Sequence, residues 1–326
     1  MARLAHKKGV YLIGRVVMFE DPMLANGRPE LAIKNPDGSV WRNQAGLGWT
    51  NPYDKRVWDY NVSIAEVAAR AGFDEIQFDY VRFPTDGDVE SIVFPGKTKT
   101  PPGWVIAEFV HYAAQRLKPL GVRISTDVFG LAATRDLGIG QVPRRLAKYV
   151  DAVYPMVYPS HFGPGEYGLD EPNNAPGATV EWSLSDFRQE LKTGKAELIP
   201  WLQDFSYGRT YGLADVKAQI EAARLMGARG YLLWNPLGIY TPGALAPEYR
   251  ALHSAQVHGD RRCHEDRVVT VSSEDSARLA VLRMLEEGVG SVAVCDSGKL
   301  IGIFTERDVL GLAGEERIST LFGSAT

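Results

Sequence analysis

The chain has 326 residues, of which 45% are hydrophobic and 23% charged, and this near-average composition excludes an intrinsically disordered, collagen-like or low-complexity protein. The net charge of −4 lacks the strong basic excess typical of a nucleic-acid-binding protein. The two cysteines, Cys263 and Cys295, are too few for a disulfide framework and too isolated for a zinc site, so we expect no metal and no required cofactor.

The amino-terminal stretch joins basic residues to a short apolar run that Gly14 and Arg15 interrupt, without a small-residue cleavage site after it. We therefore interpret it as a strand and not as a signal peptide. Apolar runs elsewhere fall short of the roughly 18 residues of a membrane helix, so we expect a cytoplasmic chain with no membrane partner. An exported full-length form is the alternative.

Short apolar runs alternate with longer amphipathic runs through residues 1–252. Strands are predicted where the runs are rich in β-branched and aromatic residues and bounded by glycine and proline: 9–19, 73–83, 121–130, 150–159, 196–205 and 229–236. This alternation predicts parallel strands joined by right-handed crossovers, in a sheet covered on both faces or in a barrel. The six units are fewer than the eight of a closed β/α barrel.

Helices are predicted between several of these strands. Asn51 is the expected N-cap of the first, whose apolar stripe comprises Val57, Ile64, Val67 and Ala71. The helix over 103–118 is expected to bury Trp104, Ala107, Val110, Ala114 and Leu117, and the helix over 213–226 to bury Val216, Ile220 and Ala223.

Residues 253–266 are polar, charged and aperiodic, which indicates a linker between the domain at 1–252 and a second domain at 267–326. The second domain reads as a strand, a helix, a hairpin turning at Asp296-Ser297-Gly298, and a final helix. Ser272 and Asp275 form a capping-box pattern at the start of its first helix.

Carboxylates stand near the ends of two neighbouring predicted strands, where parallel α/β folds bind ligands. Strand alternation places Gln77 and Asp79 on the face opposite Ile76, Phe78 and Tyr80, and places Ser125 and Asp127 together in the next strand. Two purely structural alternatives remain: Asp79 pairs with Arg82, or Asp127 caps the next segment.

Further candidates follow the same edge of the sheet. Gln203 and Asp204 must point to opposite faces if their strand is regular, and the tyrosines at 154 and 158 serve the core or form a binding platform. Trp234 either stacks on a sugar ring or packs internally. The loop 159–181 is long and rich in Gly, Pro and Asn, which is typical of a functional lid, and its His161 either binds substrate or is solvated.

Paired carboxylates at neighbouring strand ends suit glycoside hydrolysis. One group protonates the leaving oxygen, and the other attacks the anomeric carbon or activates water. Aromatic residues around the same mouth fit the faces of sugar rings.

Several motifs, in order, resemble a family of bacterial glycoside hydrolases that is distantly related to the alpha-amylase superfamily: GFDEIQFDYVRFP (72–84), STDVFG (125–130), PMVYPSHFGPG (155–165), PWLQDF (200–205) and LLWN (232–235). The stretch 15–43 matches as well, and the resemblance covers nearly all of residues 5–242. It implies an α/β fold, an incomplete TIM-type barrel of six units that holds the third to eighth strands of the family and lacks the first two.

The resemblance implies that Asp79 is the nucleophile, Asp127 the acid/base and Asp204 the stabiliser of the transition state. Asp127 stands where the amylase pattern has Glu, which shortens its reach by one methylene. A carbohydrate substrate would be bound by the remaining candidates, namely Arg15, Gln77, Arg82, Tyr154, Tyr158, His161, Trp201, Gln203, Trp234 and Asn235.

The absence of two barrel strands implies exposed edges at 9–19 and 229–236, which we expect to leave a gap, to pair under strain, or to be covered by dimerisation. A non-catalytic sugar-binding or degenerate barrel is the alternative function.

The C-terminal domain resembles a single CBS (cystathionine-beta-synthase) domain, and its segment 302–308 matches that family's adenosine-nucleotide signature. The resemblance implies that Thr305 contacts phosphate and Asp308 the ribose of AMP, ADP, ATP or S-adenosylmethionine. CBS modules work in pairs, so a homodimer would complete the site. A nucleotide-sensing regulatory protein with a passive barrel is the corresponding alternative.

Overall fold

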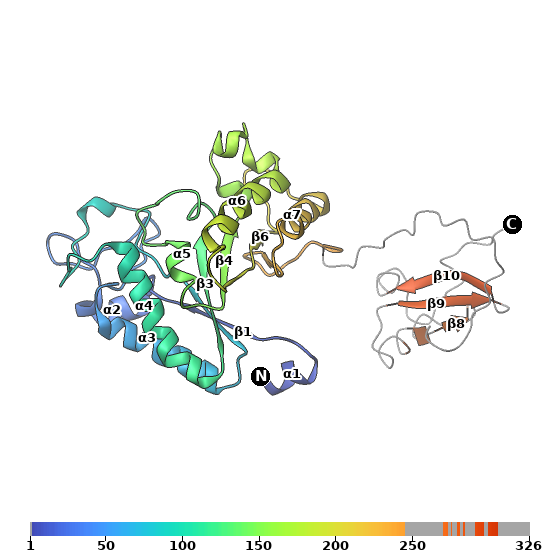
Figure 1. Ribbon diagram of the computed structural model, residues 1–326, viewed down its shortest axis with the longest axis horizontal. Coiled ribbons are helices and arrows are strands. Elements are labelled where there is room, and N and C mark those ends of the chain that lie inside the picture. The colour runs from blue at the N-terminus through green and yellow to red at the C-terminus, as the bar shows by residue number, and fades with distance from the viewer. Residues whose placement is uncertain are drawn as a thin grey trace. The chain divides into compact units, whose positions relative to one another are not determined.

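The computed structural model describes residues 2–244, followed by 270–272, 275, 279–280, 283, 291–296 and 299–305. The chain forms two compact units, Met1–Ala246 and Pro247–Thr326. Figure 1 shows the first unit as a curled sheet with helices packed around its outer side. Within the described residues, no helix is both long and apolar enough to span a bilayer.

A parallel sheet in the order β1-β2-β3-β4-β6-β7, with β5 beside β4, forms the centre of the first unit. Each strand lies inside one of the six predicted runs: β1 (Ile13–Val17), β2 (Glu75–Asp79), β3 (Arg123–Phe129), β4 (Ala152–Val157), β5 (Glu197–Leu198), β6 (Trp201–Gln203) and β7 (Leu232–Trp234). Pro200, which has no N–H to donate, separates β5 from β6 within the fifth run.

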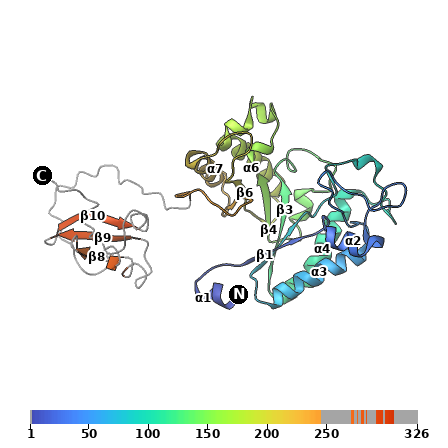
Figure 2. The same ribbon diagram turned by 180° about the vertical axis from the view of Figure 1, so that it is seen from behind.

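The helices of this unit are α1 (Ala2–Lys7), α2 (Pro22–Gly27), α3 (Lys55–Arg70), α4 (Pro102–Leu117), α5 (Pro143–Leu146), α6 (Pro176–Leu191) and α7 (Leu213–Leu225). Short 3₁₀ turns lie at Pro29–Leu31, Val89–Ser91, Lys118–Leu120, Pro159–His161, Glu166–Gly168 and Pro172–Asn174. Helices α3 and α4 lie side by side against one part of the sheet, and α6 and α7 lie together against another, in both views (Figures 1 and 2).

The sheet curls but does not close. Among the described strands, β1 pairs with β2 alone and β7 with β6 alone, so both remain edges. The expected incomplete TIM-type barrel is therefore confirmed, with a gap between its first and last strands. A side-chain contact spans this gap, because the Arg15 guanidinium of β1 lies 5.7 Å from the Trp234 ring centroid of β7.

A polar cluster fills the interior of the sheet at the amino-terminal ends of its strands. The Glu75 carboxylate, which is 1% exposed, accepts hydrogen bonds from Ser125 Oγ (2.5 Å) and Tyr11 Oη (3.0 Å). Arg123 Nε lies 3.6 Å from the same carboxylate, and Arg123 Nη2 donates to Glu197 at 2.6 Å. These bonds link β2, β3 and β5 and satisfy a charge that would otherwise be costly to bury.

The apolar layer between sheet and helices is aromatic. The Phe109 ring of α4 contacts Phe78 from β2 at 5.7 Å, Phe19 at 5.2 Å and Trp58 from α3 at 5.8 Å between ring centroids. Edge-on packing of this kind adds to the free energy gained from burial alone.

Two helix predictions were wrong in detail. Asp54, not Asn51, caps α3 through a bond from Arg56 N, and Ile64 and Val67 are exposed because Trp58 and Val62 turn the opposite side of the helix toward the core.

In α4, the predicted core residue Trp104 is 48% exposed and is covered by the Arg145 guanidinium at 4.1 Å. The stripe predicted for α7, with Val216, Ile220 and Ala223, is buried as expected.

The described part of the second unit is a three-stranded sheet in the order β10-β9-β8, formed by β8 (Thr270–Ser272), β9 (Ser291–Asp296) and β10 (Lys299–Thr305). Strands β9 and β10 form the predicted antiparallel hairpin, and β8 runs parallel to β9. The Asp275 carboxylate accepts from Ser272 N at 2.8 Å, which is one half of the predicted capping box. The linker 253–266 and Asp308 lie outside the described residues.

Gly140 precedes Gln141, whose side chain forms hydrogen bonds with the backbone at the carboxyl end of β3. Gln141 Oε1 accepts from Phe129 N at 2.8 Å, and its Nε2 donates to the Asp127 carbonyl at 3.2 Å. Gly140 has φ +84°, and a Cβ there would lie 2.7 Å from Ile106 Cγ1 and 2.9 Å from the Pro102 carbonyl.

We expect Gly140→Ala to lower the free energy of unfolding by about 2–4 kcal/mol, through left-handed strain and overpacking together. Gly138→Ala is the matched control, because its φ is +73° but no atom lies within 4 Å of the added Cβ, so it should cost about 1 kcal/mol. Urea unfolding measures both values. Equal losses would contradict the predicted clash.

Candidate functional site

A cavity of about 380 Å³ opens at the carboxyl ends of the strands in the first unit. Its volume lies in the range of small-ligand sites. Every long strand of the sheet contributes to its lining, which comprises Arg15, Asp79, Tyr80, Arg82, Asp127, Phe129, Gly130, Leu131, Met156, Tyr158, His161, Phe162, Trp201 and Trp234. The lining is therefore aromatic with a few charged groups.

Arg15 joins the two predicted catalytic carboxylates. Its Nη2 donates to Asp79 Oδ2, and its Nε lies 3.8 Å from Asp127 Oδ2. Parallel pairing brings these strands together, since β1 pairs with β2 and β2 with β3. Asp79 and Asp127 are 3% and 1% exposed, so a shared cation offsets part of the cost of burying them. The parity argument thus placed both carboxylates correctly inside the sheet.

The surroundings of the two carboxyl groups differ. Asp79 accepts from Arg15 and from Tyr80 N at 2.6 Å. Asp127 accepts from Trp201 Nε1 at 2.8 Å. Burial, and next the negative charge of Asp79, raise the pKa of Asp127 well above its usual range. Asp127 is therefore the carboxyl suited to hold a proton.

Neither structural alternative for these residues is observed. Asp79 pairs with Arg15 and not with Arg82, whose Nη1 donates to the Phe83 carbonyl at 3.0 Å. The Asp127 carboxylate caps no segment, because its partners are Trp201 and Arg15.

Tyr80 departs from the face that strand alternation predicted. Strand β2 ends at Asp79, and Tyr80 adopts φ +49°, so its side chain reaches the cavity instead of the helices. Positive φ in a residue other than glycine is strained and is concentrated at functional sites. Sequence reasoning missed this residue because alternation holds only while the strand continues.

Eight of the predicted site residues are brought together at the cavity: Arg15, Asp79, Arg82, Asp127, Tyr158, His161, Trp201 and Trp234. Five are not among its lining residues: Gln77, Tyr154, Gln203, Asp204 and Asn235. Besides Tyr80, the structure adds Phe129, Met156 and Phe162, which the sequence signalled only as apolar residues near strand ends.

Two of the five lie deeper in the sheet. Gln77 is buried between Arg15 and Ser125 in the strand register, and its Nε2 has no hydrogen-bond partner. Tyr154 stands opposite Asp127 in the register of β3 and β4, but its hydroxyl interacts with Glu75, and burial and the Glu75 charge raise its pKa. Neither side chain is among the residues that line the cavity.

The other three hold loops in place. The Asp204 carboxylate accepts from Thr241 N at 2.9 Å and from Thr241 Oγ1, and Asn235 donates to the Asp204 carbonyl at 2.5 Å. Gln203 Oε1 accepts from Ser160 N at 3.1 Å. Asp204 thus fixes the segment after β7, a contact that no spacing in the sequence revealed.

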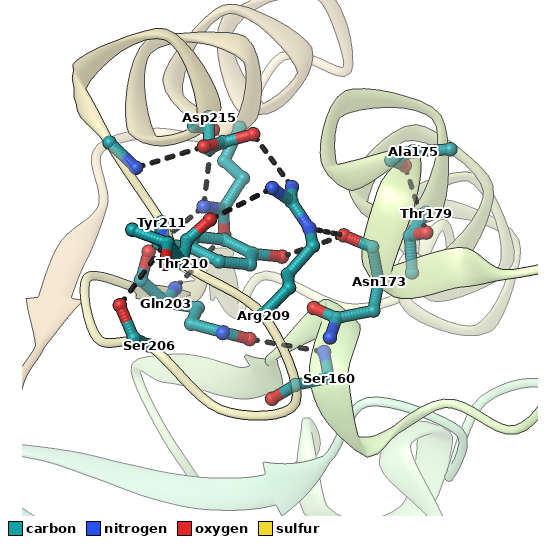
Figure 3. A network of polar contacts seen from close by, with 12 residues as sticks. Ser160, Asn173, Ala175, Thr179, Gln203, Ser206, Arg209, Thr210, Tyr211 and Asp215 are labelled. Carbon is teal, nitrogen blue, oxygen red and sulfur yellow. Dashed lines mark hydrogen bonds and ion pairs between the residues drawn. The ribbon is translucent and has the colours of Figure 1, made fainter.

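A second hollow of about 560 Å³ adjoins the cavity and shares His161 and Phe162 with it. The loops after β4 and β6 form its walls, and Figure 3 shows the bonds that tie them together. Arg209 donates from Nε to the Asn173 carbonyl and from Nη2 to Asp215, both at 2.6 Å. The Tyr207 ring, 64% exposed, lies 5.8 Å from His161.

No group of three or more His, Cys, Asp or Glu side chains in the described part of the chain is arranged to hold a metal ion. The cavity itself presents carboxyl, guanidinium and aromatic groups.

Residues 1–240 match the family model of a putative glycosyl hydrolase domain. The chain belongs to this family. Residues 263–315 match the CBS domain model, so the protein joins a glycosyl hydrolase domain to a CBS domain. The resemblance seen in the motifs is confirmed for both parts.

Solved structures are similar to parts of this chain. A hypothetical protein from Ruminiclostridium thermocellum is 43% identical over 39% of this chain, with a TM-score of 0.34, and the chain covers 63% of its length. The glycoside hydrolase domain of PgaB (BpsB) from Bordetella bronchiseptica is 14% identical over 72% of each chain, with a TM-score of 0.50, which supports the fold alone. A search of curated proteins found no significant match.

The raised pKa of Asp127 makes stability depend on pH. The folded chain keeps a proton that an unfolded Asp releases near pH 3.9, so this group's contribution to the free energy of unfolding falls as pH rises above about 4. We expect Asp127→Asn, which cannot titrate, to gain stability relative to wild type between about pH 4 and 7. Urea unfolding across this range measures the difference.

The exposed residue Asp170 supplies the control, and Asp170→Asn should follow the wild-type pH dependence. Identical pH dependence for wild type and Asp127→Asn would contradict the raised pKa.

Proposed function

We propose that the first unit is a glycosidase that cleaves a glycosidic bond of an oligo- or polysaccharide with Asp79 and Asp127 as its two carboxyl groups. The observation that carries this proposal is the contact of one residue, Arg15, with both carboxylates inside a cavity lined by aromatic rings. Membership of the glycosyl hydrolase domain family supports the same conclusion.

Different surroundings suit the two carboxyl groups to different steps. Asp127, with its raised pKa, holds the proton that the leaving oxygen requires. Asp79, charged and hydrogen-bonded, faces the developing positive charge at the anomeric carbon as nucleophile or stabilising base. Trp201 Nε1 donates to Asp127 Oδ1 and so orients this carboxyl group.

Aromatic rings in the cavity offer apolar faces for sugar rings in this proposal. Trp201 and Trp234 pack edge to face at 5.8 Å between ring centroids, and both line the cavity. The second hollow, with the exposed Tyr207 ring, adds room for a further sugar unit beyond His161. We therefore favour an oligosaccharide over a monosaccharide glycoside as substrate.

Asp204 takes a positioning role in this proposal instead of contacting the transition state. Thr241 occupies its carboxylate, and this bond fixes the segment that follows Trp234.

We expect Asp79→Asn to lower turnover by about a thousandfold or more, because the substitution removes the charge and keeps the volume. Release of reducing ends from a panel of neutral and acidic oligosaccharides provides the assay. Asp170→Asn, at an exposed position, should keep wild-type turnover. Turnover by Asp79→Asn at the wild-type rate would exclude its proposed role. Binding of oligosaccharides by wild type without any turnover would favour the non-catalytic sugar-binding alternative.

For the CBS unit, we propose weak binding of an adenosine nucleotide that a second copy of the chain strengthens. The residue Thr305 ends β10 opposite Ser291, and the sheet carries the buried apolar side chains of Val292 and Val294. The match of residues 263–315 to the CBS domain model supports the proposal, in which Asp308 would accept from the ribose hydroxyls. Nucleotides of this kind are abundant in the cytoplasm, where we place the chain.

Calorimetric titration of the full chain with AMP, ADP, ATP and S-adenosylmethionine tests this. We expect heat with at least one ligand, an apparent affinity that rises with protein concentration, and a loss of about tenfold or more in Asp308→Ala, since bonds to charged groups are strong. No heat with any ligand would leave the module as a structural appendage, and binding that Asp308→Ala leaves unchanged would contradict the proposed nucleotide site at Asp308.

A further inference from the structure

Arg82 is a buried cation in the wall of the cavity. It lies three residues after Asp79, is 6% exposed, and lines the same cavity as both carboxylates. Three aromatic rings surround its guanidinium, with centroids at 5.0 Å for Trp49, 5.0 Å for Tyr80 and 4.8 Å for Phe129. The rings hold the planar group in a fixed orientation and compensate part of its lost hydration through cation–π attraction.

Only one edge of this guanidinium is used by the protein. Nη1 donates to the Phe83 carbonyl at 3.0 Å and to Thr85 Oγ1 at 3.3 Å. The observed hydrogen bonds of Arg82 within the described residues use Nη1 and leave Nε and Nη2 for a ligand in the cavity that this side chain lines. An arginine edge with two parallel N–H groups matches a carboxylate in geometry.

No acid forms an ion pair with Arg82 in the described part of the chain. It has no carboxylate within 4.0 Å, whereas Arg15 lies within that distance of both Asp79 and Asp127. Burial lowers the pKa of Arg82, and the charges of Glu20, Asp79 and Asp86 oppose this only from beyond ion-pair distance. Burial also raises the pKa of Glu20. Asn43 Nδ2 donates to Glu20 at 3.2 Å. A cation buried without a partner is costly unless a ligand supplies the opposite charge.

We propose that Arg82 binds a carboxylate of the substrate, so that the cavity selects a glycan containing uronic acid units. This inference rests on the proposed glycosidase function and specifies its substrate class. Tyr80, held at φ +49°, covers one face of the guanidinium and lines the cavity, so its strained backbone serves the same recognition. Asp79 of the catalytic pair and the specificity group Arg82 thus come from one stretch of chain, at the end of β2.

The test compares glycans that differ only in charge. Tetrasaccharides of galacturonate, mannuronate and guluronate, and their methyl esters, are titrated by calorimetry against the full chain carrying Asp79→Asn, which suppresses turnover. We expect at least one acid to bind tenfold or more tighter than its ester. Arg82→Met should abolish this preference, a loss of about ten- to a hundredfold for the acid, and leave the ester within twofold.

Arg145→Met is the matched control, since that guanidinium also lies over an aromatic ring, Trp104, but not at the cavity. It should keep the preference. If Arg82→Met fails to fold, Arg82→Lys decides, because Lys keeps the charge without the fork and should weaken acid binding about fivefold or more.

The two proposals fail differently. Tight uronate binding without release of reducing ends from the wild-type chain would overturn the glycosidase and leave the carboxylate site. Turnover of neutral glycans alone, equal binding of acid and ester, or no binding of any acid would overturn the role of Arg82.

Discussion

A single guanidinium holds two buried carboxylates in the interior of an open sheet, and the site depends on this ion cluster. Removing Arg15 would leave Asp79 and Asp127 in close proximity without a counter-charge, at exposures of 3% and 1%. Breaking a buried charge cluster in this way is far costlier than loss of an exposed pair. The cluster also sets the chemistry, since the charge on Asp79 is one reason that the pKa of Asp127 is raised.

The same residue compensates for the unclosed barrel. Strands β1 and β7 are not hydrogen-bonded to each other, yet the stack of Arg15 on Trp234 joins their side chains across the gap at the mouth. At the opposite end, Glu75 and its partners link the interior of the strands. Side-chain contacts at the two ends of the strands thus add to the backbone pairing of this open sheet, which lacks the last strand pair of a closed barrel.

The local backbone links these features to function. The loop at 138–141 secures the end of β3 through Gln141, and the turn at Tyr80 begins where β2 stops. Both devices act at the carboxyl ends of strands, where parallel folds bind ligands. The strands therefore fix the positions of the carboxyl groups, and residues that directly follow them, such as Tyr80, line the cavity where a ligand would bind.

By itself, the sequence determined where the strands lie and that they are parallel, because strands alternate with helices along the chain. It also determined the inward position of Asp79 and Asp127, because a period of two is local and survives packing. It could not determine the role of Asp204 or the side to which Tyr80 turns, since one depends on Thr241, 37 residues away, and the other on where a strand ends. The exposed faces of α3 and α4 were likewise decided by packing around Trp58 and Phe109. Tertiary structure alone brought Arg15 to both carboxylates. Arg15 and Asp79 are 64 positions apart, Asp127 is farther still along the chain, and the pairing of β1 with β2 and of β2 with β3 brings the three residues together.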